Sequence, residues 1–170
     1  FHKGDVRPVD DVVAAVGKFG VHVVEVTGGE PLLQTATASL LTKLADAGHT
    51  VLVETSGAVT IEGLDPRAHL IVDVKLPASG EWDRNRWSNL PLLSPGKDEV
   101  KFVIADDNDY AVAVDVVRTR PFPKGVTLLF SPSFPGMSPT TLAEKIIADR
   151  LPVRFQLQLH KVLWGEKPGV

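Results

Sequence analysis

The sequence contains no cysteine and has no excess of positive charge. Without cysteine, its 170 residues cannot supply a disulfide, a thiolate zinc site or the usual ligands of an iron–sulfur cluster. The formal net charge is −3, so the sequence lacks the excess of Lys and Arg that is typical of nucleic-acid-binding proteins, and nucleic acid is not an expected partner. No apolar run approaches the roughly 18 residues of a membrane span, and no signal peptide is recognisable. We therefore expect no membrane association and a cytoplasmic protein.

Several catalytic motifs are also missing. The sequence has no Ser-His-Asp order, Walker loop, GxGxxG or HExxH, so the chemistries of those motifs are not indicated. What is present is an ordinary globular composition, with 44% hydrophobic and 23% charged residues. The length fits one domain, residues 1–170, with a sizeable core. Because the chain opens on Phe1 in what has the pattern of mid-domain sequence, we expect that an N-terminal segment is absent.

Segments with strand and helix patterns alternate along the chain. Helical spacing of apolar residues, with Asp5 or Asp10 as a candidate cap for the first helix, predicts helices over residues 10–19, 34–47, 109–118 and 139–149. Apolar, β-branched runs predict strands over residues 21–26, 50–54, 69–74, 99–104, 126–130 and 153–159. This order predicts an α/β fold with a parallel sheet. An incomplete (β/α) barrel is the preferred architecture, and an open doubly wound sheet is the alternative.

Residues 76–98 interrupt this alternation. The segment is rich in Pro, Gly and Asn and contains Trp82 and Trp87. Long loops without regular structure are often functional, so the segment is interpreted as an insertion or lid over a rim. The alternative is a surface excursion held in place by the two tryptophans.

The most informative stretch is residues 24–32. An apolar strand ends there in Thr27, Gly28, Gly29 and Glu30, followed by a proline. Paired glycines permit positive φ and let a ligand approach the backbone closely. Glu30 adds a carboxylate beside exposed N–H groups, which suits a ligand with both an ammonium and a carboxylate, such as an amino acid. The alternative is a plain tight turn between strand and helix.

Polar residues gather at the carboxyl ends of the predicted strands. In a parallel sheet these ends meet on one side, where ligands bind. Glu54 is a candidate ligand group or an ordinary helix cap, Lys75 a ligand group or a solvated lysine, and His160 a ligand group or a structural histidine. Lys101 is interpreted as a rim or salt-bridge lysine, and the acidic run 106–109 as a turn with a helix cap. The strand-end residues with polar side chains or adjacent glycines are Thr27, Gly28, Gly29, Glu30, Glu54, Thr55, Ser56, Gly57, Asp73, Lys75, Ser131, Ser133, Gln158, His160 and Lys161.

The stretch Thr27-Gly28-Gly29-Glu30-Pro31-Leu32-Leu33-Gln34 resembles the Gly-Gly-Glu motif of radical S-adenosylmethionine enzymes. The later segments Glu54-Thr55-Ser56-Gly57, Lys75, Glu99-Val100-Lys101-Phe102-Val103-Ile104 and Gln158-Leu159-His160-Lys161 narrow the resemblance to the 7-carboxy-7-deazaguanine synthases. These are lyases of queuosine and 7-deazapurine biosynthesis. The similarity runs from about Val21 to the C-terminus.

The resemblance implies a partial (β/α)6 TIM-like barrel of the radical S-adenosylmethionine type, without its first strand and cluster loop. It implies S-adenosylmethionine, a [4Fe–4S] cluster and Mg2+ as cofactors, an external electron donor such as flavodoxin, and a homodimer. In the family, a 5′-deoxyadenosyl radical removes hydrogen from 6-carboxy-5,6,7,8-tetrahydropterin, whose ring contracts with loss of ammonia. The implied S-adenosylmethionine contacts are Gly28, Gly29, Glu30, Ser56 and Lys75, and the implied pterin contacts are Thr27, Glu54, Gln158 and His160.

This chain departs from the family pattern in two respects. The cluster cysteines and the threonine near the metal precede the Gly-Gly-Glu strand in the family and are absent here, so the fragment by itself is expected to be inactive. Asp73-Val74-Lys75 stands where many members have Ser-Pro-Lys. Two other functions stay open at this point: another radical S-adenosylmethionine protein, such as an activase, or a binding barrel without a cluster.

Overall fold

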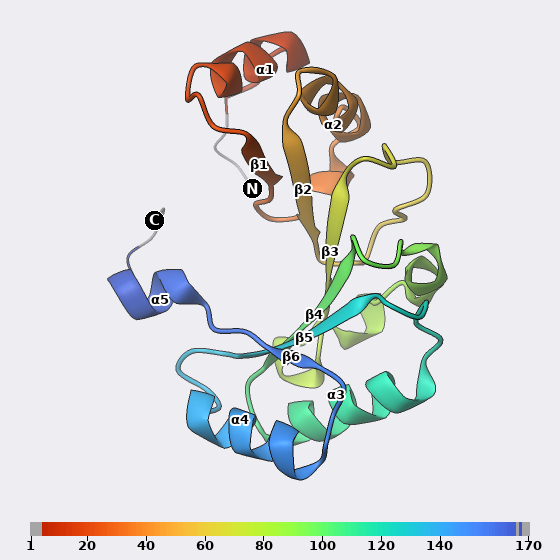
Figure 1. Cartoon of the computed structure of the whole chain (residues 1–170), viewed down its shortest axis with the longest axis vertical. Helices are drawn as coiled ribbons and strands as arrows, with labels where there is room; N and C mark the ends of the chain where they lie inside the picture. The colour runs from red at the N-terminus through yellow and green to blue at the C-terminus, as the bar shows by residue number, and fades with distance from the viewer. Residues whose placement is uncertain (1–4, 166, 168–170) are drawn as a thin grey trace.

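The computed structural model describes residues 5–165 and 167, arranged as Figure 1 shows. The α-helices are α1 (Val9–Gly17), α2 (Thr37–Asp46), α3 (Asp107–Thr119), α4 (Pro139–Ala148) and α5 (Leu159–Trp164). The strands are β1 (Val23–Val26), β2 (Thr50–Thr55), β3 (His69–Val74), β4 (Glu99–Ile104), β5 (Thr127–Pro132) and β6 (Arg154–Phe155). Short 3-10 helices are η1 (Pro31–Leu33), η2 (Pro77–Ser79), η3 (Trp82–Arg84) and η4 (Trp87–Leu92). None of these described helices is long and apolar enough to cross a membrane.

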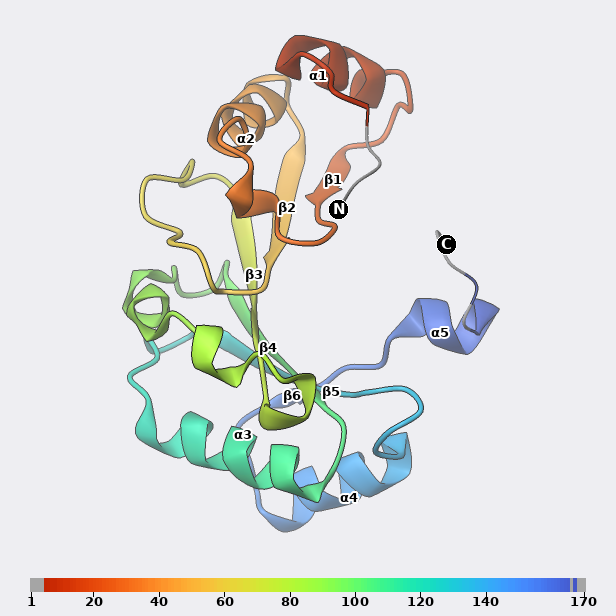
Figure 2. The ribbon, with the colours of Figure 1, turned by 180° about the vertical axis from the view of Figure 1, so that it is seen from behind.

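The six strands form one sheet in the order β1-β2-β3-β4-β5-β6, and every neighbouring pair is parallel. The predicted α/β class with a parallel sheet is therefore confirmed. The sheet twists strongly, so that β4, β5 and β6 run across the direction of β1 and β2 in both ribbon views (Figures 1 and 2). Because all strands point the same way, their carboxyl ends lie at the same edge of the sheet.

One face of the sheet packs against helices and forms the core. Along β2, β3 and β4 every second residue is buried, as the two-residue period of a strand requires. Phe102 and Phe130 are fully buried with ring centroids 5.3 Å apart, and Tyr110 of α3 meets Phe130 at 6.3 Å. We call the opposite face the inner face. Register places Glu25, Glu54, Ile71, Asp73 and Lys101 on it.

The capping prediction holds for α3, which begins at Asp107, two residues before the predicted start, and it fails for α1. Oδ1 of Asp106 accepts the N–H of Asp109 at 2.8 Å, which confirms that the acidic run caps a helix. At α1 the N-cap position belongs to Pro8, and neither Asp5 nor Asp10 caps the helix, so that prediction was wrong. Asp10 lies in the first turn instead, where a negative charge still favours the helix dipole.

The predicted strand over residues 153–159 is wrong in extent, because β6 contains only Arg154–Phe155. β6 pairs with β5 alone, and the N–H of Gln156 donates to the carbonyl of Phe130 at 2.9 Å. The next ladder bond toward β6 would come from the N–H of residue 132, which is a proline and has none. The chain leaves the sheet there, and Gln158 precedes helix α5 rather than ending a strand.

Residues 76–98 are more ordered than the sequence predicts. They contain η2, η3 and η4, and Leu76, Leu90 and Leu93 belong to the core. The side chain of Asn89 is buried, donates to the carbonyls of Gly57 and Val59 at 3.1 and 2.8 Å, and accepts from Ile61. The segment is thus fastened to the β2–β3 connection.

A second fastening joins this segment to α3. Asp109 is 1% exposed, and its two carboxylate oxygens accept the N–H groups of Ala78 at 3.0 Å and Ala105 at 3.1 Å. The tryptophans pack edge to face with centroids 5.2 Å apart, and the Arg120 guanidinium lies 4.1 Å from the Trp87 ring centroid. The two tryptophans thus contact each other, and Trp87 contacts the residue that follows α3; the role of the segment, as a lid or as a surface excursion, stays a prediction.

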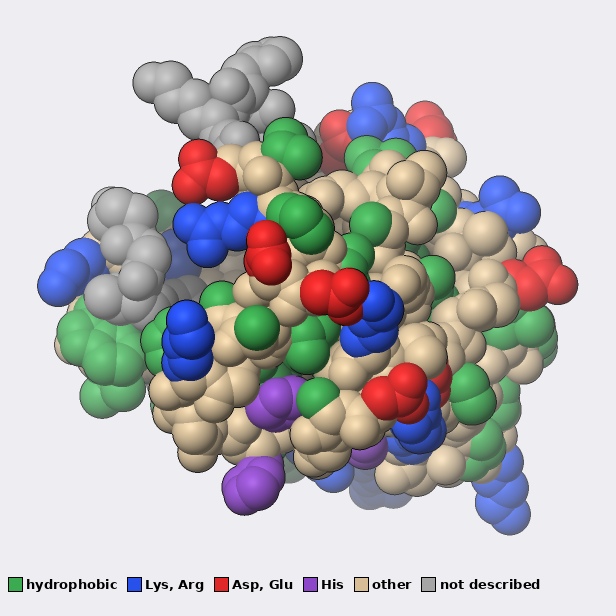
Figure 3. All heavy atoms as spheres, turned by 90° about the horizontal axis from the view of Figure 1, so that it is seen from above, with side chains coloured by type: hydrophobic (Ala, Val, Ile, Leu, Met, Phe, Trp, Pro, Cys, Tyr) green, Lys and Arg blue, Asp and Glu red, His purple; other side chains and the backbone are tan. Residues whose placement is uncertain are grey.

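Charged side chains are dispersed over much of the surface. On the face seen from above, acidic and basic groups alternate in small clusters with apolar groups between them (Figure 3). Arg67 pairs with Asp46 at 2.8 Å and with Asp65 at 2.7 Å. An exposed pair such as Arg67–Asp46 adds little to stability.

Candidate functional site

The turn after β1 exposes its backbone to solvent. Gly28 and Gly29 have φ values of 95° and 60°, a region that glycine enters at little cost. Thr27, Gly28 and Gly29 are all exposed, and no hydrogen bond within the described residues uses the N–H or carbonyl of either glycine. Several backbone donors and acceptors at the strand end therefore have no partner among the described residues and could bind a ligand.

Glu30 joins this turn to the end of β2. Its Oε1 accepts the N–H of Leu32 and the hydroxyl of Thr55, each at 2.9 Å, and its Oε2 accepts the N–H of Ser56 at 2.8 Å. The hydroxyls of Thr55 and Ser56 also donate to Oε2. Because a carboxylate offers about four lone-pair sites, the chain's own donors occupy Glu30 and fix the turn.

A cavity of about 250 Å³ lies between this turn and the ends of β2 and β3. It gathers most of the sequence-predicted site residues, although they are far apart in the sequence. The lining residues are Thr27, Gly28, Gly29, Glu54, Thr55, Ser56, Asp73 and Lys75.

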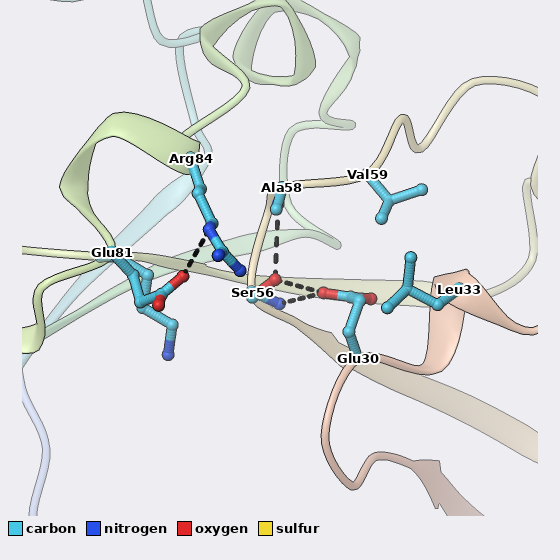
Figure 4. Close-up of a pocket in the computed structure, with 8 residues that line it drawn as sticks. Glu30, Leu33, Ser56, Ala58, Val59, Glu81 and Arg84 are labelled. Atoms are coloured by element: carbon cyan, nitrogen blue, oxygen red, sulfur yellow. Dashed lines mark hydrogen bonds and ion pairs between the residues drawn. The ribbon is translucent and has the colours of Figure 1, made fainter. Parts of the chain in front are cut away.

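A second cavity of about 410 Å³ shares Ser56 and Lys75 with the first. Figure 4 shows its wall: the Glu30 carboxylate points toward Ser56, with the apolar side chains of Leu33 and Val59 on one side. On the other side Glu81 and Arg84 of the 76–98 segment form an ion pair of 2.9 Å. The two cavities together offer a polar end and a partly apolar end.

Lys75 stands where these cavities meet. Its ammonium pairs with Oδ2 of Asp73 at 2.6 Å, and its side chain is 31% exposed. Oδ1 of Asp73 is buried and has no hydrogen-bond partner within the described part of the chain. A buried acceptor without a partner is uncommon, and this one lies on the wall of the first cavity.

Glu54 belongs to an ion pair that crosses the inner face. Nζ of Lys101 donates to Oε1 of Glu54 at 2.7 Å. The Glu54 side chain is 29% exposed and the Lys101 side chain is 17% exposed. The predicted salt-bridge role of Lys101 is confirmed, and the alternative of Glu54 as a helix cap is not what the structure shows. Glu54 lines the first cavity, so its carboxylate is available to a ligand there.

The pKa of Glu25 is raised, first by burial and then by the charge of Glu54, while Lys101 opposes the shift. A carboxyl group whose pKa is higher in the folded than in the unfolded protein destabilises the fold as pH rises through the raised value. We expect Glu25→Gln to raise the melting temperature by about 1–2 °C at about pH 7.5. The gain should vanish near about pH 4, as thermal unfolding at the two pH values would show. An equal gain at both would assign the effect to packing instead.

Gln158 and the backbone of His160 belong to the start of α5, and Gln158 does not line the first cavity. Gln158 is half-buried and lines a cavity of about 280 Å³ between residues 132–139 and α5, together with Phe134 and Lys161. α5 projects away from the other α-helices in both ribbon views (Figures 1 and 2). The backbone of His160 lies in α5, but its side chain lies outside what the structure describes. The structure therefore does not bring Gln158 to the first cavity, and its role stays a prediction.

The sequence indicated most of the first cavity but missed how it is built. Thr55 was noted only as a strand-end residue, yet its hydroxyl helps to hold Glu30. Asp73 is both a polar strand-end residue and a departure from the family pattern in the sequence, and in the structure it pairs with Lys75. A charged residue at an inner position of an apolar strand, such as Glu54 or Lys101, was the signal that could have suggested their pairing.

The overall fold is similar to that of SuiB from Streptococcus suis. The structure of SuiB bound to S-adenosylmethionine matches with a TM-score of 0.64 and 10% identity over 93% of this chain and 45% of SuiB. The structure of SuiB bound to the precursor peptide SuiA gives a TM-score of 0.60 and 8% identity, over 95% of this chain and 45% of SuiB. The chain thus spans less than half of SuiB, and at this identity the likeness shows the fold alone.

Sequence relatives identify the family, although no protein-family model matches. The 7-carboxy-7-deazaguanine synthase of Chlorobaculum tepidum is 41% identical over 164 residues, 95% of this chain and 74% of the relative. That of Koribacter versatilis is 38% identical over 186 residues, 100% of this chain and 82% of the relative. The synthase of Thermoplasma acidophilum is 31% identical over 172 residues, which cover 100% of this chain and 80% of the relative. At these identities and coverages, the chain belongs to the 7-carboxy-7-deazaguanine synthase family.

Proposed function

We propose that this chain forms the S-adenosylmethionine and pterin sites of a 7-carboxy-7-deazaguanine synthase, a lyase. The reaction is the ring contraction of 6-carboxy-5,6,7,8-tetrahydropterin to 7-carboxy-7-deazaguanine with loss of ammonia. The observation that carries the proposal is the cavity in which Gly28 and Gly29 meet Glu54, Ser56 and Lys75. It combines free backbone groups with charges of both signs, which suits a ligand that carries an ammonium and a carboxylate.

Gly28, Gly29, Glu30, Ser56 and Lys75 would form the S-adenosylmethionine site. The free backbone groups of the two glycines would meet its ammonium and carboxylate, and Lys75 would add a positive charge. Glu30 would act through the turn that it holds, because its carboxylate oxygens already accept from Leu32, Thr55 and Ser56. When bound, S-adenosylmethionine supplies the group that abstracts a hydrogen atom from the pterin.

Thr27, Glu54, Gln158 and His160 would bind the pterin. The Glu54 carboxylate can accept charge-assisted hydrogen bonds from the amino-pyrimidinone edge of the ring. Such an acceptor also gives specificity, since a ligand without those N–H groups would leave the charge unpaired. Support for this placement comes from the position of Glu54 on the inner face beside Thr27 in the same cavity.

Two further cofactors of the family reaction, a [4Fe–4S] cluster and Mg2+, do not fit the residues described here. The sequence has no cysteine for a cluster. Within residues 5–165 and 167, no group of three or more His, Asp or Glu residues could hold a metal ion. The sequence therefore offers no cysteine ligand for the cluster, and residues 5–165 and 167 offer no cluster of side chains for Mg2+.

The finer architecture is part of the same proposal. We expect the open six-stranded sheet to be most of a partial (β/α)6 barrel within a single domain, 1–170, with the inner face lining its interior. Residues 76–98 would border the cofactor site, because Glu81 and Arg84 line the second cavity. A homodimer and an electron donor such as flavodoxin stay predictions.

The decisive experiment uses the complete protein, reconstituted with iron and sulfide without oxygen and supplied with a reductant. Incubation with the tetrahydropterin and S-adenosylmethionine should yield 7-carboxy-7-deazaguanine and ammonia, detected by mass spectrometry and an ammonia assay. The control reaction omits S-adenosylmethionine and should give no product. A reconstituted protein that neither binds nor converts the pterin would rule out the proposed function.

A further inference from the structure

Charges are distributed unevenly around Glu54 on the inner face. On one side lies β1 with a second carboxylate, Glu25, and on the other side lies β4 with Lys101. Glu25 pairs with Leu52, two residues before Glu54 on the same face of the sheet, and Lys101 contacts Glu54 directly. The raised pKa of Glu25 agrees with a second carboxylate close by. Glu54 is therefore repelled from the open edge at β1 and attracted toward the middle of the sheet.

Lys101 reaches Glu54 across an intervening strand. β3 lies between β2 and β4, with Ile71 opposite Glu54 and Asp73 opposite Lys101. Because neighbouring strands are about 4.8 Å apart, the two backbones are separated by roughly 10 Å, and only a long side chain spans that gap. The contact of 2.7 Å between Nζ and Oε1 is largely shielded from water, since the lysine side chain is 17% exposed.

A nearer carboxylate is already engaged. Asp73 stands directly opposite Lys101 in the register, but its Oδ2 pairs with Lys75 at 2.6 Å. The two lysines thus form ion pairs with different carboxylates: Lys75 pairs with Asp73, and Lys101 pairs with Glu54. This arrangement engages Oε1 of Glu54 and leaves Oε2 without a donor in the part of the chain that the structure describes.

We propose that Lys101 is a positioning residue for the substrate. By holding Oε1 of Glu54 over the middle of the inner face, it presents Oε2 to the N–H donors of the pterin. The inference rests on the proposed function, because it requires that Glu54 binds the pterin. Its physical basis is preorganisation: the glutamate loses its rotational freedom on folding, so that less of this cost falls on binding. Lys101 itself makes no contact with the substrate.

The test compares Lys101→Met with Lys101→Arg in the complete reconstituted enzyme. Methionine keeps the length and most of the apolar volume of lysine but cannot pair with Glu54, whereas arginine keeps the charge and the reach. Lys145→Met is the matched control, because Lys145 pairs with Asp107 at 3.0 Å on the outer surface, away from both cavities. The measurements are kcat and KM for the pterin, its Kd from equilibrium dialysis, the Kd of S-adenosylmethionine and the melting temperature.

Lys101→Met should raise KM and Kd for the pterin about tenfold, the equivalent of about 1.4 kcal/mol. kcat and the Kd of S-adenosylmethionine should stay within about twofold, Lys101→Arg should recover most of the loss, and Lys145→Met should match the wild type. Three results would overturn the inference while the proposed function stands. They are an unchanged KM for the pterin in Lys101→Met, an equal loss of affinity for both ligands together with a lower melting temperature, or a Lys101→Arg variant as weak as Lys101→Met. A wild-type enzyme that does not bind the pterin would overturn both.

Discussion

Glu54→Ala is expected to raise the Kd of the pterin about 100-fold, because charge-assisted hydrogen bonds contribute about 1.5–3 kcal/mol each. The substitution removes the acceptor at the inner wall of the first cavity and leaves Lys101 without its partner. S-adenosylmethionine affinity should change by less than about threefold, since Glu54 makes no hydrogen bond to the turn after β1 within the described residues. Equilibrium dialysis with each ligand separately measures both effects.

Two further variants make the Glu54 result specific. Glu54→Gln keeps the shape but lacks the charge and replaces one acceptor by a donor, so its effect should lie between the wild type and alanine. Glu99→Ala is a matched control, because Glu99 occupies the same side of the sheet at the start of β4 and pairs with Arg154 at 3.5 Å. Equal weakening of both ligands in Glu54→Ala would contradict the assignment of Glu54 to the pterin.

Glu30→Ala is expected to damage both cofactor binding and the fold. It frees four donors, the N–H groups of Leu32 and Ser56 and the hydroxyls of Thr55 and Ser56, in a partly buried site. The expected cost is about 3 kcal/mol of unfolding free energy, or a fall of about 6–12 °C in melting temperature. Without its fastening the glycine turn is free to move, and S-adenosylmethionine affinity should fall about 100-fold.

The control for Glu30 is another glutamate of the same cavity. Glu81 lines the second cavity and pairs with Arg84 at the rim, where its side chain is 44% exposed. Glu81→Ala should therefore leave the melting temperature within about 1 °C of the wild type, because exposed ion pairs contribute little. If Glu30→Ala lowered cofactor affinity without any loss of stability, Glu30 would be a direct ligand contact rather than a residue that shapes the turn.

The sequence predicted those parts of the fold that depend on local pattern. Strands β3 and β4 have the predicted bounds, because long β-branched runs bounded by polar residues leave little ambiguity. β6 was mispredicted because its length is set by Pro132 on a neighbouring strand, which no reading of residues 153–159 alone can show. The capping of α1 was mispredicted because Asp10 falls one position inside the helix that begins at Val9.

The candidate site, like the fold, has features that local sequence predicts and features that depend on contacts between distant segments. The sequence predicted the turn at Gly28 and Gly29, because paired glycines at a strand end are a local signal, and both glycines have positive φ. The pairing of Glu54 with Lys101 was not predicted, since it depends on the register of β2, β3 and β4 and joins residues 47 positions apart. The same holds for Asp109, whose acidic neighbours predicted a cap but whose own carboxylate holds residues 76–98 in place.

The hydrogen bonds of Glu30 also bear on how this site can change during evolution. One side chain ties the loop after the first strand to the loop after the second, so the two loops cannot drift independently. A replacement of Thr55 or Ser56 would be transmitted to the glycine loop through the same carboxylate. Variation among natural relatives should therefore be correlated at these three positions, and laboratory evolution that seeks a new substrate would find it easier to alter the Glu54 side of the cavity.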